Sequence, residues 1–174
     1  MALNPAEARR DAEVAAKERA CALAARRPGY SLGQHIMTEQ VEFLVPDGEL
    51  IKNAEMVGLL NPETGGQMHL DLYLAKYKVA LEFHGPQHDR LTELHSDPKE
   101  LEAQQRRDEL KAAWCRERGI LLIVVRAENL DFDWLIQRLA PHVQLNTDKR
   151  GRWHIFRFLE RIARNYRQKA ASRA

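Results

Sequence analysis

The chain has 174 residues, 44% of them hydrophobic and 30% charged, with a formal net charge of +2. This composition is typical of a soluble globular protein of about one domain. No apolar run approaches the roughly 20 residues that span a membrane, and the N-terminus lacks the apolar core of a signal peptide. We therefore expect a cytoplasmic protein with no membrane contact. Its two cysteines, Cys21 and Cys115, are expected to be reduced thiols and to form neither a disulfide nor a zinc site.

Helices are predicted at both ends of the chain. Residues 5–27 are rich in Ala, Arg and Glu, with Pro5 near the start and Pro28-Gly29 as the stop. Their apolar stripe is weak, so residues 1–30 are interpreted as a helical arm, either packed loosely on the domain or contacting a partner. Residues 146–174 are predicted to contain a basic helix, about 153–169, with its apolar face on the core and its arginines outward.

Residues 31–145 are expected to form the core. Ser31 is a candidate N-cap for a helix to about Leu44, and residues 49–58 are predicted to form a strand. Residues 68–74 and 79–83 predict a β-hairpin joined by residues 75–78. A helix over about 99–118, with its buried side formed by Leu101, Leu110, Ala113 and Trp114, precedes an apolar run over 120–125. This run predicts a central strand covered on both faces, and a short helix over 132–139 follows it.

Two acids, Asp71 and Glu82, interrupt the apolar pattern of the hairpin. A carboxylate is costly to bury unless a cation compensates its charge. Two carboxylates on neighbouring strands are ligands that Mg²⁺ prefers, and the backbone carbonyl of Phe83 is a candidate third ligand. Alternate residues of a strand face the same side, so His84 is expected to point with Glu82, as a hydrogen-bond donor or a general base.

The helix over 99–118 carries a polar stripe of Gln104, Asp108 and Lys111, at positions i, i+4 and i+7. Such a stripe is commonly a solvated face, and Asp108 has the alternative of a purely structural pairing with a neighbouring cation. Gln104 or Gln105 is a candidate for orienting water or a phosphate group.

These residues carry a resemblance to a known family. Asp71 followed by Glu82-x-His84 resembles the core of the PD-(D/E)xK nuclease superfamily. A longer pattern resembles its very-short-patch-repair and homing-endonuclease-like branch, namely Glu82-x-His84-Gly85-x-Gln87-His88 and then Gln104-Gln105-x-x-Asp108-x-x-Lys111. The resemblance covers about residues 39–126. The chain departs from the pattern where His84 replaces the motif lysine and where Leu70, not proline, precedes Asp71.

The resemblance implies an α/β fold with a restriction-endonuclease-like core, in which helices flank a mixed central sheet. It implies a Mg²⁺-dependent endonuclease, with Mn²⁺ as a substitute, that hydrolyses phosphodiester bonds in DNA. Repair, homing, restriction and phage DNA processing all use this core. No small-molecule cofactor is implied. A homodimer formed through the terminal helices would supply two sites for double-strand cleavage.

The site residues that follow from the pattern and the resemblance fall into three groups. The expected catalytic residues are Asp71, Glu82, His84, Lys111 and Gln104, with Lys111 favoured over His84 for the role of the missing strand lysine. The metal ligands are Asp71, Glu82, Phe83 and, from the preceding helix, Glu39. The expected DNA-binding residues are Gln87, His88, Arg107, Arg157, Arg161, Arg164 and Arg167.

Two other functions remain open at this point. A nuclease-like DNA-binding subunit without catalysis is suggested by the missing strand lysine. A zinc hydrolase is the third hypothesis, because the alternating pair His69 and Asp71 allows a shared site with His84, His88 or His95. The chain has no helical His-Glu-x-x-His motif, which disfavours this third hypothesis.

Overall fold

The computed structural model describes residues 4–26, 31–85 and 98–172. The order of its elements along the chain is α1 (Pro5–Ala24), α2 (Leu32–Leu44), β1 (Leu50–Leu60), β2 (Gln67–Leu74), η1 (Ala75–Tyr77), β3 (Val79–His84), α3 (Pro98–Glu117), β4 (Leu121–Arg126), η3 (Ala127–Asn129), α4 (Phe132–Leu139) and α5 (Trp153–Ser172). The protein is therefore of the α/β class, as predicted.

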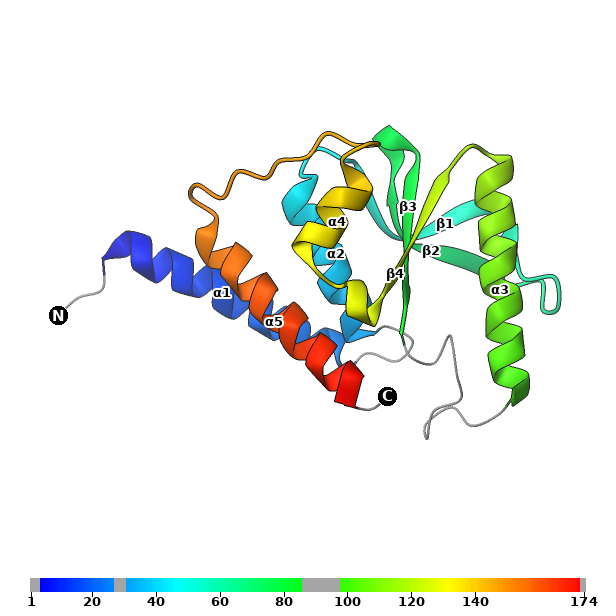
Figure 1. The fold of residues 1–174 in the computed structure, drawn as a ribbon, viewed down its shortest axis with the longest axis horizontal. Coiled ribbons are helices and arrows are strands. Elements are labelled where there is room, and N and C mark those ends of the chain that lie inside the picture. Colours follow the sequence, from blue (N-terminus) through cyan, green and yellow to red (C-terminus); the bar gives the residue numbers. More distant parts are fainter. Residues whose placement is uncertain (1–3, 27–30, 86–97, 173–174) are drawn as a thin grey trace.

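The strands form one mixed sheet in the order β1-β2-β3-β4. β1, β2 and β3 pair antiparallel, whereas β3 and β4 pair parallel, with α3 as the crossover between them. Figure 1 shows α3 on one side of the sheet and α2 and α4 on the other, with α1 and α5 beyond them. The larger hydrophobic core lies on the side of α2, α4 and α5, and a smaller one includes Cys115 of α3.

Local sequence signals place the helices. The Ser31 hydroxyl accepts a hydrogen bond of 3.0 Å from the Gln34 amide and caps α2, as predicted. The Asp131 carboxylate accepts one of 2.9 Å from the Asp133 amide and caps α4. Both strands of the predicted hairpin are confirmed as β2 and β3, and Lys78 takes a left-handed conformation at φ 52° to close the turn between them.

The position of β4 corrects one expectation. This apolar strand was predicted to be central, but it lies at an edge of the sheet among the described residues, and Leu121 is 38% exposed. The faces are covered as predicted, because Ile123 and Val125 belong to the larger core and Leu122 packs against the smaller one. An apolar run thus reports burial of both faces of a strand, which helices can provide without a second neighbouring strand.

Two smaller corrections concern β1 and α3. β1 continues past Gly58 to Leu60, with an irregular register after Glu55, whereas the strand was predicted to end at Gly58. On α3, Leu110 is 36% exposed, although it was expected on the buried side, and Cys115 is fully buried. Polar side chains occupy much of the face that α3 turns to the sheet, which an apolar pattern does not report.

The N-terminal helix α1 packs on α2 and α5 through charged pairs. Lys17 of α1 pairs with Glu39 of α2. Glu18 pairs with Arg161 of α5 at 3.0 Å. In the described part of α1, Ala24 is buried, and Val14 and Cys21 are partly buried against the larger core, so apolar burial adds a modest contribution to this packing. None of the helices in the described ranges is long and apolar enough to cross a bilayer.

Candidate active site

The two acids of the hairpin lie where β2 and β3 part. The paired register of these strands runs from Leu74↔Val79 to Leu72↔Leu81. Beyond it, the Asp71 amide donates a 3.0 Å hydrogen bond to Glu82 Oε1, and the Phe83 amide donates one of 2.8 Å to Asp71 Oδ2. Each carboxylate therefore accepts a backbone amide of the opposite strand. These bonds fix both side chains between the diverging strands.

Glu82 is buried, with 4% of its surface exposed. Burial and, second, the neighbouring charge of Asp71 raise the pKa of its carboxyl group, Lys111 lowers it, and the net result is a pKa of about 7. A buried acid with a raised pKa beside a second acid is a common feature of functional sites, because it favours binding of a cation or a proton.

Helix α3 supplies the positive charge of the site. The Lys111 ammonium donates a 2.6 Å hydrogen bond to Glu82 Oε2. Two residues after Glu82 on β3, His84 Nε2 lies 3.7 Å from Asp108 Oδ2. Two residues along a strand advance about 6.6 Å, and three or four along a helix about 4.5–6 Å. Because β3 and α3 run antiparallel and these advances are similar, Glu82 can pair with Lys111 while His84 pairs with Asp108. The polar stripe of α3 therefore faces β3.

A hydrogen-bonded chain continues along α3 from the His84 pair. Asp108 Oδ1 accepts a 2.9 Å hydrogen bond from Gln104 Nε2, and Gln104 Oε1 accepts one of 2.7 Å from the Arg107 guanidinium. The expected catalytic residue Gln104 thus orients Asp108. The pairing of Asp108 with His84 was not anticipated from the sequence, although the matched spacing of strand and helix was a signal that pointed to it.

Two carboxylates fit Mg²⁺ better than Zn²⁺. Mg²⁺ is commonly held by one or two carboxylates and keeps several waters, whereas zinc needs three or four protein ligands. Across the described ranges, no group of three or more His, Cys, Asp and Glu side chains is arranged to hold a metal ion. His69, a ligand of the alternative zinc site, lies 4.0 Å from Glu55 of β1.

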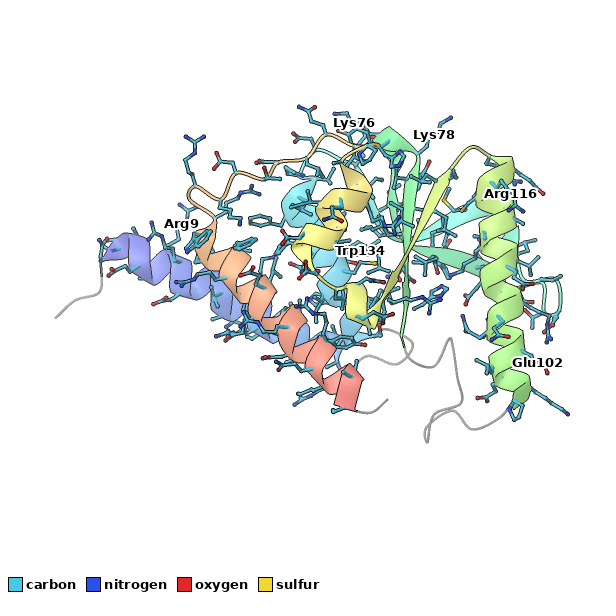
Figure 2. All side chains as sticks on the ribbon, viewed as in Figure 1. Arg9, Lys76, Lys78, Glu102, Arg116 and Trp134 are labelled. Carbon is cyan, nitrogen blue, oxygen red and sulfur yellow. The ribbon has the colours of Figure 1, made fainter. Side chains whose placement is uncertain are left out.

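The structure places several predicted residues away from the acid pair. Glu39, the expected further metal ligand, pairs with Lys17 of α1, and its side chain is 11% exposed. Gln87, His88 and His95 lie outside the described residues. Figure 2 marks the two ends of α3 by Glu102 and Arg116, on the side of the molecule away from α5.

The arginines of α5, predicted to bind DNA, divide into two kinds. Arg161 pairs with Glu18, and Arg167 pairs with Asp131 at 3.2 Å while also donating to the Leu130 carbonyl. These two hold the fold together. Arg157 and Arg164 are exposed and form no ion pair within the described part of the chain, so their charge is available to a ligand.

Comparison with known proteins gives partial viral relatives. The chain is 31% identical over 94 residues to uncharacterized protein 094L of Frog virus 3 (isolate Goorha), covering 53% of this chain and 61% of that protein. It is 32% identical over 96 residues to uncharacterized protein 307L of Invertebrate iridescent virus 6, covering 51% and 49%. No family model matches the chain, and no solved structure matches it significantly. The chain thus spans about half the length of these relatives, whose names state no activity.

Proposed function

We propose that this chain is a metal-dependent endonuclease that hydrolyses phosphodiester bonds in DNA and is built on a restriction-endonuclease-like core. The observation that carries the proposal is the meeting of Asp71, Glu82 and Lys111 where β2 and β3 part. Phosphodiester hydrolysis needs an activated water and positive charge on the phosphate. Two acids and one cation from three separate elements are the groups that this chemistry requires.

Asp71 and Glu82 are the proposed ligands of the metal, with the backbone carbonyl of Phe83 beside them. Bound Mg²⁺ would lower the pKa of a coordinated water and polarise the phosphate. The hydrogen bonds from the opposite strands hold each carboxylate in place before any ligand arrives. Such preorganisation lowers the cost of assembling the site.

Lys111 takes the role of the missing strand lysine in this proposal. Its ammonium lies 2.6 Å from Glu82 Oε2, and it reaches the acid pair from α3. There it offsets negative charge on the phosphate and orients the attacking water. His84, held by Asp108 at 3.7 Å, is the proposed proton donor or acceptor on the same face of β3.

A plasmid-nicking assay in Mg²⁺, Mn²⁺ and EDTA tests the proposal. We expect metal-dependent cleavage by the wild-type chain and a loss of about 10²–10³-fold or more in the Asp71→Asn and Glu82→Gln variants, because each removes one anionic ligand. Glu109→Gln is the matched control, since this exposed acid of α3 directly follows Asp108. Circular dichroism checks that all variants fold. Full cleavage by both site variants would refute the assignment.

A DNA-binding subunit without catalysis is the second candidate. This candidate is favoured because both carboxylate oxygens of Glu82 already accept hydrogen bonds, one from the Asp71 amide and one from the Lys111 ammonium. A metal ion would have to compete with this ion pair. Salt-sensitive binding to DNA with no cleavage in Mg²⁺ or Mn²⁺ is the result that this candidate predicts.

A further inference from the structure

An exposed aromatic ring lies at the start of α5. Trp153 is 49% exposed. Its ring is nearly parallel to that of Phe156, with centroids 5.4 Å apart and planes at 21°. Phe156 in turn stacks on Phe132, at 4.8 Å and 27°. Phe132 and Phe156 are buried in the larger core, so stacked rings lead from the core to the surface and hold the indole in place.

Two cations flank this ring. Lys149 Nζ lies over the Phe156 ring, 3.6 Å from its centroid, and 5.3 Å from the centroid of Trp153. The guanidinium carbon of Arg157 lies 5.9 Å from the Trp153 centroid. Neither side chain forms an ion pair with any residue that the structure describes. A single exposed apolar residue is ordinary. An indole packed on the core beside two positive charges that have no ion-pair partner among the described residues combines an aromatic surface with an anion-attracting one.

We infer that Trp153, Lys149 and Arg157 form a binding surface for single-stranded DNA. An unpaired base stacks on the indole, and the two cations pair with the phosphates on either side of it. Aromatic rings beside basic side chains are the usual means of binding single strands, because every unpaired base has a free π-face. Bases inside a duplex are already stacked on one another, so a duplex gains only the charge contacts.

The other occupants fit less well. A second copy of the chain, docked about a twofold axis, would bring Lys149 and Arg157 close to their own copies, and like charges would repel. The choice of DNA as the nucleic acid rests on the proposed function. On that basis, the substrate class is DNA that carries an unpaired segment, such as a flap, a bubble or a branch.

Equilibrium binding to an oligothymidylate of about 16 nucleotides and to a duplex of equal length, in EDTA, tests the inference. We expect Trp153→Ala to weaken single-strand binding by about 5- to 150-fold, the range for loss of one stacked base. Duplex affinity should change by less than about twofold, because phosphate contacts supply it. Trp153→Phe should retain most of the affinity. Leu23→Ala, at a residue 70% exposed on α1, is the control and should bind normally.

Equal losses for single strands and duplex, or no loss for either, would overturn the inference. So would a change in self-association of Trp153→Ala, measured by sedimentation, without a change in binding. The test is independent of cleavage. Single-strand binding through Trp153 by a chain that cuts no DNA would leave this inference standing and refute the nuclease. Cleavage of DNA by a chain that does not bind single strands would support the nuclease and refute this inference.

Discussion

At Glu82 two physical demands conflict. The side chain is 4% exposed, and burial favours the neutral acid, yet a carboxylate must be charged to hold a cation. Lys111 and the Asp71 amide stabilise the charged form, and they only partly offset the cost of burial. If the site binds the proposed metal ion, binding would therefore displace a proton from Glu82 near neutral pH.

This conflict predicts a pH-dependent stability. The folded pKa of Glu82 is about 7, above its ordinary value of 4.5, so between these values the folded chain binds a proton that the unfolded chain releases. The free energy of unfolding should thus fall as pH rises from about 4.5 to 7, by about 3 kcal/mol at most. Urea unfolding in EDTA at several pH values measures it.

Glu82→Gln provides the comparison for that measurement. The amide cannot ionise, so the difference in stability between wild type and variant should shift in favour of the variant as pH rises. Mg²⁺ added at pH 7.5 should stabilise the wild type and not the variant, because ligand binding to the folded state adds to its stability. A difference that stays constant from pH 5 to 7.5 would contradict the raised pKa.

At the scale of elements, α2, β3 and α5 meet at Phe83. The Phe83 and Tyr166 rings pack edge to face, with centroids 5.9 Å apart. A Cβ added at Gly33 of α2 would lie 2.2 Å from Phe83 Cζ. The side chain of Phe83 thus anchors the strand on the side opposite to its neighbours Glu82 and His84.

Gly33→Ala should therefore destabilise the protein, although alanine is the better helix former by about 1 kcal/mol. The clash with the ring should cost about 1–3 kcal/mol in the free energy of unfolding, net of that gain. Thermal or urea unfolding measures the loss. Phe83→Leu in the same chain should recover part of it, since a smaller side chain makes room. If the effects of Gly33→Ala and Phe83→Leu on the free energy of unfolding simply add, the clash with the Phe83 ring is not the cause of the destabilisation.

The elements themselves could be predicted from the sequence more fully than their contacts. The hairpin placed Asp71 and Glu82 on neighbouring strands, and this proximity follows from chain-local signals. The inward direction of the α3 stripe does not, because a polar stripe usually indicates a solvated face, and Lys111 was expected at the site through the family resemblance alone. The edge position of β4 also escaped prediction, since hydrophobic pattern reports covered faces and carries no information on strand order.

For the molecule as a whole, polar side-chain pairs supply much of the contact between α1 and the rest of the fold. Two ion pairs, Lys17–Glu39 and Glu18–Arg161, and one hydrogen-bonded pair, Glu13–His154, link α1 to α2 and α5. Their members lie 22, 143 and 141 positions apart in the chain, which no periodicity can reveal. The sequence predicted a loosely packed arm from its weak apolar stripe, and polar pairs supply contacts to α2 and α5 that hydropathy does not record.

Salt should loosen this helix selectively. Cys21 of α1 is half-buried, and it should react with a thiol reagent mainly when α1 detaches. At 1 M salt the screening length is about 3 Å, and each exposed pair contributes about 0.2–1 kcal/mol. The labelling rate of Cys21 should thus rise roughly tenfold between low salt and 1 M NaCl. Cys115 is fully buried in the smaller core and should stay protected, which distinguishes local detachment from global unfolding.

Lys17→Met separates charge from packing in this experiment. The variant keeps an apolar side chain over Glu39 and removes the least exposed of the three pairs, in which Lys17 is 34% and Glu39 11% exposed. Its Cys21 should react faster than that of the wild type at low salt and respond less to added salt. If the wild type shows no salt dependence, apolar contacts hold α1 in place. If Cys21 and Cys115 become reactive together, α1 detaches only when the whole chain unfolds.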